Sequence, residues 1–230
     1  MKTIGLIGGM SWESTLPYYR QINEEVRARL GGLHSAKLIL YSVDFHDVER
    51  LQEAGDWDAA GALLARTAVA LQAAGADFLL LCTNTMHRVA AEIEAAVTIP
   101  LLHIADATAT AVADSGHDTV GLLGTRFTME EAFYRDRLQQ LHGLRVVVPA
   151  TAARAAVHRI IYDELCRGII RDESRELYRK VIDELAAQGA QAVILGCTEI
   201  ALLVGADDSP LPLFDTAALH ALAAVDLALA

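Results

Sequence analysis

The sequence has few cysteines and no excess of basic charge. Only Cys82, Cys166 and Cys197 occur among its 230 residues. An odd number of cysteines, in a chain large enough to fold without cross-links, argues against a disulfide framework and predicts free thiols in a reducing compartment. Lysine and arginine number 19 against 30 aspartates and glutamates, which gives a formal net charge of −11. Because nucleic acids and anionic lipids attract clustered basic side chains, neither is an expected partner.

Long apolar segments are also missing. The longest apolar stretches are interrupted, as Arg66 interrupts residues 62–71. The N-terminal stretch is broken by Gly5, Gly8 and Gly9 and lacks the cleavage pattern of a signal peptide. We therefore expect no membrane partner and a cytoplasmic location. Apolar residues still make up 53% of the chain, which is enough to form a sizeable core.

Short apolar runs alternate with longer amphipathic stretches. Six runs have the pattern of buried strands: Thr3–Ile7, Lys37–Val43, Asp77–Cys82, Thr119–Leu123, Leu144–Val148 and Gln191–Gly196. Eight stretches have the period of helices: Ser14–Leu30, Trp57–Ala74, Thr85–Ala96, Ala105–Asp114, Met129–Leu141, Ala155–Arg167, Ser174–Gln188 and Thr216–Leu229. Thr128 and Glu131 have the spacing of a capping box. The alternation predicts an α/β fold with parallel sheets covered by helices.

Three landmarks recur at nearly one offset. They are Gly5–Gly8 with Gly121–Gly124, Gly75-Ala76 with Gly189-Ala190, and Cys82-Thr83 with Cys197-Thr198, at offsets of 116, 114 and 115. One such match is common among α/β proteins, but three in the same order predict two pseudo-symmetric lobes. We place the first lobe at residues 1–98 plus 210–230 and the second at residues 99–209. The active site is expected in the cleft between the lobes.

A Cys-Thr pair ends one predicted strand in each repeat, directly before a predicted helix. Ligands of parallel sheets bind at the carboxyl ends of the strands, so Cys82 and Cys197 are candidate site residues. The dipole of the following helix would lower the pKa of each thiol. Two such thiols suit a proton transfer in which one acts as base and the other as acid. Cys166 has no comparable motif and is interpreted as a small buried hydrophobic residue.

Five ordered segments carry a family resemblance. They are Gly-Gly-Met-Ser-Trp-Glu-Ser-Thr at 8–15, Leu-Gly-Gly-Leu-His-Ser-Ala at 30–36, Val-Asp-Phe-His at 43–46, Cys-Thr-Asn-Thr at 82–85 and Gly-Cys-Thr-Glu at 196–199. Over essentially the whole chain the sequence resembles the aspartate/glutamate racemase family, most closely its aspartate and broad-specificity amino acid racemases. The resemblance implies an isomerase that interconverts L- and D-amino acids with no cofactor and no pyridoxal phosphate, and that forms a homodimer.

The resemblance also implies roles for single residues. Cys82 and Cys197 match the two catalytic cysteines, and Asn84, Thr85 and Thr198 match positions that hold the α-carboxylate. The full set expected to bind substrate is Met10, Gln52, Thr83, Asn84, Thr85, Thr125, Thr198 and Glu199. Glu199 would orient the substrate ammonium or tune the neighbouring thiol, and it could equally serve only to stabilise the start of a helix.

The substrate side chain is left open by the sequence. Glutamate racemases carry Asp-Ser where this chain has Gly9-Met10, and His where it has Glu199, which disfavours glutamate. Arg50 and Arg167 are candidate partners for the side-chain carboxylate of aspartate, although surface roles are ordinary for both. Gln52 is an equally plausible neutral contact. Aspartate or a broader set of amino acids is therefore expected.

Two other functions remain compatible with the sequence. A related isomerase could act on a dicarboxylate or a hydantoin with the same framework. A non-enzymatic two-lobe protein could bind a small molecule while its thiols take no part. The chain has neither the Gly-x-Gly-x-x-Gly pattern of dinucleotide sites nor a phosphate-loop motif, and its eight histidines follow no metal-ligand spacing. We therefore expect neither a bound nucleotide nor a metal.

Overall fold

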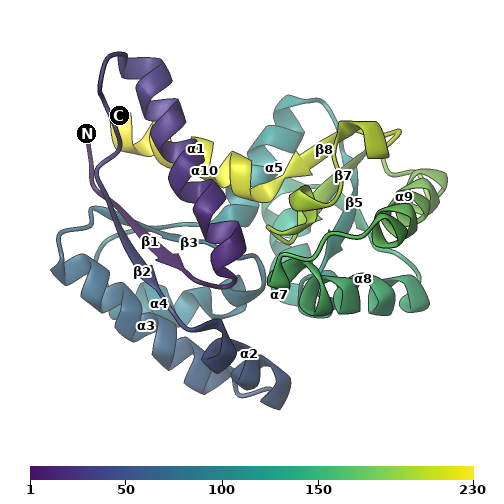
Figure 1. Ribbon diagram of the computed structural model, residues 1–230, viewed down its shortest axis with the longest axis horizontal. Coiled ribbons are helices and arrows are strands. Elements are labelled where there is room, and N and C mark those ends of the chain that lie inside the picture. Colours follow the sequence, from purple (N-terminus) through teal and green to yellow (C-terminus); the bar gives the residue numbers. More distant parts are fainter. The chain divides into compact units, whose positions relative to one another are not determined.

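The structure is a computed structural model that describes residues 1–230 (Figure 1). The chain divides into two compact units, hereafter unit 1 (residues 1–104 and 220–230) and unit 2 (residues 105–219). Each unit contains one four-stranded parallel sheet with helices around it, so the predicted α/β class is confirmed. None of the helices is both long enough and apolar enough to cross a membrane.

Unit 1 is built on a sheet with the strand order β2-β1-β3-β4. Its elements are β1 (Ile4–Gly8), α1 (Trp12–Leu30), β2 (Leu38–Ser42), α2 (Phe45–Ala54), α3 (Trp57–Ala73), β3 (Phe78–Leu81), the 3₁₀ turn η1 (Thr85–Val89), α4 (Ala90–Ala96), β4 (Leu101–Leu102) and most of α10 (Thr216–Leu229). Strands β1 and β3 are buried along their whole length, as continuous apolar runs predict for inner parallel strands. Helix α3 packs against the sheet beside α4 (Figure 1).

Unit 2 repeats this plan with the strand order β6-β5-β7-β8. Its elements are α5 (Ile104–Asp114), β5 (Thr119–Gly124), α6 (Arg126–Glu130), α7 (Ala132–Asp136), the π-helical turn η2 (Arg137–Leu141), β6 (Arg145–Val147), α8 (Thr151–Asp163), η3 (Leu165–Arg167), α9 (Asp172–Ala187), β7 (Ala192–Gly196), η4 (Ile200–Leu202), η5 (Ala206–Asp208) and β8 (Leu213–Asp215). The same strand order in both sheets confirms the two similar lobes that the repeat predicted.

Two short strands were not foreseen from the sequence. Strand β4 pairs with β3 through Leu79↔Leu101, and β8 pairs with β7 through Val193↔Leu213. Each follows a proline, and two or three residues are too few to show an alternating pattern. Because pairing joins β4 to unit 1 and β8 to unit 2, the units divide at residues 104 and 219, where the sequence suggested 98 and 209.

The helices differ most from the predicted ones at residues 45–54 and 126–141. Residues 45–54 form α2, whose N-cap Asp44 accepts a hydrogen bond from the His46 backbone N–H at 3.0 Å. The predicted helix at 129–141 is instead three short pieces that begin at residue 126. The predicted capping box at Thr128 and Glu131 is wrong, because the N-cap is Thr125, whose hydroxyl accepts from the Thr128 N–H at 3.3 Å.

A buried histidine joins the last helix to the rest of unit 1. The Tyr18 hydroxyl, on α1, lies 2.9 Å from His220 Nδ1, and His220 Nε2 lies 2.8 Å from the Leu102 carbonyl oxygen. A carbonyl only accepts, so Nε2 carries the proton and Nδ1 accepts from Tyr18. Burial lowers the pKa of His220 to about 4, although the Leu102 carbonyl acts in the opposite direction. The imidazole is therefore neutral at pH 7.

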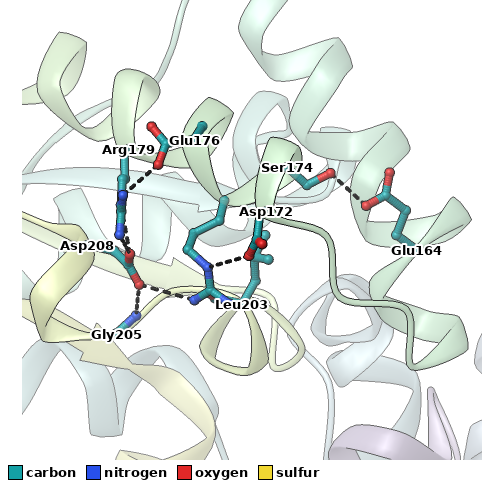
Figure 2. Close-up of polar contacts among 9 residues, drawn as sticks. Glu164, Asp172, Ser174, Glu176, Arg179, Leu203, Gly205 and Asp208 are labelled. Carbon is teal, nitrogen blue, oxygen red and sulfur yellow. Dashed lines mark hydrogen bonds and ion pairs between the residues drawn. The ribbon is translucent and has the colours of Figure 1, made fainter.

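An ionic cluster holds the segment after β7 against α9 in unit 2 (Figure 2). The Asp208 carboxylate accepts from the Gly205 backbone N–H at 2.9 Å and from Arg179 Nε at 2.8 Å. Arg175 lies 3.4 Å from the same carboxylate and also donates to the Leu203 carbonyl. The Gly205 N–H and then the Arg179 guanidinium lower the pKa of Asp208. The cluster thus fixes the stretch of chain that follows Cys197.

Candidate active site

Cys82 directly follows the inner strand β3 of unit 1. Its backbone N–H donates to the Ile7 carbonyl of β1 at 2.9 Å, and its side chain is fully buried. The next residue, Thr83, donates its N–H back to Leu81 at 2.8 Å, which forms a tight turn. The thiol is therefore held at the carboxyl edge of the sheet, where parallel sheets bind ligands.

His87 fixes this turn from the other side. His87 Nδ1 lies 2.7 Å from the Thr83 carbonyl oxygen, and the Ile104 N–H donates to His87 Nε2 at 3.3 Å. A carbonyl can only accept and a backbone N–H can only donate, so this imidazole is neutral with its proton on Nδ1. His87 was not among the residues selected from the sequence. Its position four residues after Thr83, in a predicted helix, could have indicated that its side chain reaches back to this turn.

The other predicted residues of unit 1 lie around the same edge. Asn84 and Thr85 are buried at the start of η1. Gln52, on α2, is also buried, and its Nε2 lies 2.9 Å from the sulfur of Met86. Met10, expected to bind substrate, is only 3% exposed and belongs to the apolar core cluster of unit 1. The structure thus brings Gln52 to the segment that follows Cys82.

Cys197 holds the equivalent place in unit 2. It follows Gly196, which ends the inner strand β7 and pairs with Gly124 of β5. A Cβ atom at Gly196 would lie 2.8 Å from the Leu123 carbonyl oxygen, so the close approach of the two strands requires glycine. Thr125 directly follows Gly124, so the predicted residues Thr125 and Cys197 lie at the same edge of the sheet. The Thr125 hydroxyl already accepts a hydrogen bond as the N-cap of α6.

Glu199 is the immediate partner of the second thiol. Cys197 Sγ donates to Glu199 Oε2 at 3.0 Å, and the Thr198 hydroxyl donates to the same oxygen at 2.8 Å. All three side chains are buried, and Glu199 is only 2% exposed. A carboxylate that accepts hydrogen bonds while shielded from water interacts strongly with any neighbouring charge. In this state Cys197 is a thiol that donates its proton toward Glu199.

The structure corrects the expected thiol pKa values. Helix dipoles were expected to lower them, but burial raises the pKa of Cys82. Burial raises the pKa of Cys197 as well, and the nearby Glu199 carboxylate raises it further. The segments after the two cysteines are short 3₁₀ turns, which provide little dipole to oppose these effects. Both cysteines are therefore protonated in the substrate-free state.

Two further residues of unit 2 join this cluster. Cys166, interpreted from the sequence as a buried hydrophobic residue, lies in η3 and is only partly buried. Burial raises its pKa, and so do the charge of Glu199 and a hydrogen bond with its carboxylate. Tyr178, on α9, is fully buried, and its pKa is raised first by burial and then by Cys197. Both residues are far from Cys197 in the sequence, which gave no signal for either.

The basic candidates remain at the surface of their units. Arg50 lies on α2 and Arg167 ends η3, and both side chains are exposed. All three cysteines are unpaired. No group of three or more histidine, cysteine, aspartate or glutamate side chains has an arrangement that could hold a metal ion. The side chains beside the two cysteines supply carboxylate, hydroxyl and amide groups.

Comparison with known proteins gives consistent matches over the whole chain. The family model described as Asp/Glu/Hydantoin racemase matches residues 7–224. The broad-specificity amino-acid racemase RacX of Bacillus subtilis is 25% identical over 99% of this chain and 98% of its own length.

Solved structures agree with this match. A candidate Asp/Glu racemase from Yersinia pestis is 61% identical with a TM-score of 0.92, and both chains are covered completely. An aspartate racemase homologue from Pyrococcus horikoshii is 35% identical with a TM-score of 0.85, again over both whole chains. Matches of this extent are decisive: the chain belongs to the Asp/Glu/hydantoin racemase family.

Proposed function

We propose that the protein interconverts L- and D-amino acids without a cofactor, using Cys82 and Cys197 as its two proton-transferring groups. The observation that carries this proposal is the matched position of the thiols. Each directly follows the inner strand of its sheet, β3 or β7, and the two sheets have the same strand order. Incidental thiols have no reason to occupy equivalent edges of two repeats.

The chemistry needs one thiolate and one thiol at a time. A thiolate removes the α-proton of one enantiomer, and the other thiol returns a proton to the α-carbon from the opposite side. The two cysteines exchange roles in the reverse direction. Because burial disfavours both thiolates, one thiol must release its proton to solvent water as substrate binds, which leaves the thiolate that acts as base. Cys82 ionises more readily, since burial alone raises its pKa.

The residues beside the thiols would bind the substrate. Thr83, Asn84, Thr85 and Thr198 supply buried hydroxyl, amide and N–H groups suited to an α-carboxylate. Glu199 would attract the ammonium group and hold the Cys197 proton. Gln52 and Met86 are neutral groups, while Arg50 and Arg167 are exposed. We therefore propose aspartate or a broader set of amino acids as substrates, in line with the names of the relatives.

A proton-exchange experiment tests the reaction itself. The purified protein, dialysed without cofactor and with a chelator, is incubated in heavy water with L- and D-amino acids. Loss of the α-proton is followed by NMR and the opposite enantiomer by chiral chromatography. The proposal predicts both for some amino acids. No exchange across the panel would refute it, and would favour a dicarboxylate or hydantoin isomerase or a binding protein.

We also propose that the protein is a cytoplasmic homodimer. Free thiols at the proposed catalytic positions suit a reducing compartment. Helix α1 carries Trp12, Leu16 and Tyr19 at 58%, 57% and 52% exposure, and their spacing puts them on one face. An exposed apolar stripe of this kind favours burial against a second copy. Sedimentation of Leu16→Glu should then give a monomer, while Leu222→Glu on α10 should not; a monomeric native protein would refute the dimer.

A further inference from the structure

His87 contacts the segment after Cys82 through three separate groups. Its Nδ1 donates to the Thr83 carbonyl oxygen at 2.7 Å, its backbone N–H donates to the Asn84 carbonyl at 3.1 Å, and its Nε2 accepts from the Ile104 N–H at 3.3 Å. The side chain is only 3% exposed. Both ring nitrogens are therefore paired, and the imidazole cannot change its orientation without losing a buried hydrogen bond.

Neighbouring histidines pack around the ring of His87. The centroids of the His87 and His103 rings lie 4.2 Å apart, and His103 is buried as well. The ring of His220, on α10, has its centroid 6.2 Å from that of His87, and its Nε2 donates to the Leu102 carbonyl at 2.8 Å. The imidazole of His87 is thus held by hydrogen bonds at both nitrogens and by packing, which makes it a rigid support.

The contact with His87 completes a set of hydrogen bonds that fixes the backbone at Cys82. The Cys82 N–H donates to the Ile7 carbonyl at 2.9 Å. The Thr83 N–H donates to the Leu81 carbonyl at 2.8 Å, and the Thr83 carbonyl accepts from the imidazole. Burial alone raises the pKa of the Cys82 thiol, and no hydrogen bond fixes its sulfur. The backbone therefore sets the direction of this thiol.

Unit 2 builds the corresponding turn without an imidazole. At the offset of 115 that relates the two Cys-Thr pairs, Leu202 takes the place of His87. The Leu202 N–H donates to the Glu199 carbonyl at 3.0 Å, which matches the backbone contact of His87, but the leucine side chain is 40% exposed. There the sulfur of Cys197 is held directly, by the carboxylate of Glu199. Because the backbone turn forms with leucine at this position, the imidazole in unit 1 has a task beyond forming it.

We propose that His87 is a positioning residue that holds the Cys82 thiol in place for proton transfer at the α-carbon. The inference rests on the proposed racemase function. His87 contacts only the backbone beside the thiol and keeps its own proton throughout, so it acts through position alone. A displacement of about 1 Å at a reacting group can cost roughly a hundredfold in rate. Loss of the imidazole should therefore slow the proton transfers in which Cys82 takes part.

His87→Leu tests the inference in two single-cysteine backgrounds. The substitution gives unit 1 the residue that unit 2 has at the corresponding position. In Cys197→Ala, where Cys82 remains, it should slow exchange of the substrate α-proton by roughly ten- to a hundredfold. In Cys82→Ala, where Cys197 remains, it should leave the exchange rate unchanged. An equal loss in both backgrounds would overturn the proposal, because it would show a general loss of structure or of substrate binding.

Two further variants separate the hydrogen bond from the volume of the ring. His87→Asn places an amide N–H near the position of Nδ1, and in Cys197→Ala it should recover most of the exchange rate that leucine loses. His87→Gln is equally polar but places its amide near the position of Nε2, so it should recover little. If His87→Leu fails to fold, this pair still decides, because equal exchange rates in the two amide variants would overturn the proposal.

A last measurement does not depend on racemase activity. Cys82 is fully buried, so iodoacetamide reaches its sulfur only when the turn opens. His87→Leu should raise the alkylation rate of Cys82 by about tenfold and leave that of Cys197 unchanged, while His87→Asn should lower the Cys82 rate again. Peptide mass spectrometry reports both thiols in one sample. If the native protein racemises no amino acid, the proposed function fails, while an unchanged Cys82 rate in His87→Leu would overturn the role of His87 itself.

Discussion

Units 1 and 2 have the same strand order and a cysteine at the same place, but the groups around the two thiols differ in charge. The turn after Cys82 is fixed by the neutral His87, and neutral Gln52 and Met86 lie in contact nearby. Cys197 instead donates to the carboxylate of Glu199. Two units with the same backbone plan can therefore hold two thiols with different free energies of ionisation. Such a difference suits a reaction that needs one thiolate as base and one thiol as acid.

Removing either thiol should have the largest effect. Cys82→Ala and Cys197→Ala should each reduce racemisation by about 10²–10⁴-fold, because each deletes one of the two proton-transfer groups. Each variant should still exchange the α-proton of one enantiomer with deuterium, since the remaining cysteine can remove and return it on one side. NMR with each pure enantiomer should give opposite preferences for the two variants. If both variants exchanged the same enantiomer, the two cysteines would not act on opposite sides of the α-carbon, which would contradict equivalent roles for units 1 and 2.

Lowering the pH should reduce the stability of unit 1 through the titration of His220. Its pKa is about 4 in the folded protein because of burial, below the ordinary value of 6.5, so the stability it contributes is present above pH 6.5 and is lost as pH falls toward 4. Between pH 7 and 5 the free energy of unfolding should drop by about 2 kcal/mol. Urea titrations followed by tryptophan fluorescence can measure this, since both tryptophans, Trp12 and Trp57, lie in unit 1.

The control for this prediction is His220→Gln. Glutamine keeps a donor for the Leu102 carbonyl but does not titrate. Its fluorescence-detected unfolding should depend less on pH between 7 and 5 than that of the native protein. An unchanged pH dependence would assign the acid sensitivity to another group.

The stability of unit 2 should instead depend on the carboxylate of Asp208. Asp208→Asn weakens the contacts with Arg175 and Arg179, and should lower the free energy of unfolding by about 1–2 kcal/mol. The folded pKa of Asp208 is lowered, so this contribution is present above the unfolded pKa and is lost as pH falls through the folded pKa. Circular dichroism at pH 7 measures the change. Asp226→Asn, which removes an exposed partner of Arg29 in unit 1, should cost less than Asp208→Asn.

The smallest effect concerns the order in which the thiols react. Cys82 should be alkylated faster than Cys197 at any given pH, because Glu199 adds to the burial that both share. Glu199→Gln should raise the Cys197 rate by about tenfold and reduce the difference, since a neutral amide no longer repels the thiolate. Peptide mass spectrometry after brief iodoacetamide treatment gives both rates. A slower Cys197 in the glutamine variant would contradict this view of the site.

The sequence predicted the plan of the fold because periodicity and the repeat are local signals. All six predicted strands are present, and the glycines after α3 and α9, Gly75 and Gly189, have the positive φ angles that helix ends require. Strands β4 and β8 were missed because two or three residues carry no periodic pattern. Residues 129–141 have a continuous helical pattern, but the structure divides them among α6, α7 and η2.

The candidate site was predictable only where its members are neighbours in sequence. Thr198 and Glu199 directly follow Cys197, so their contact could be anticipated. Cys166 and Tyr178 belong to η3 and α9, and their electrostatic interaction with Cys197 arises only in the folded chain. The direction of the thiol pKa shifts was also missed, because the degree of burial is a property of the folded chain.

The placement of α10 also affects the order of folding during synthesis. Residues 220–230 complete unit 1, although that unit begins at the N-terminus. Residues 105–219 emerge from the ribosome earlier, so unit 2 has all four of its strands while unit 1 still lacks the helix that carries His220. Domains usually fold in the order of their synthesis. Here the unit in the middle of the chain is the first whose residues have all been made.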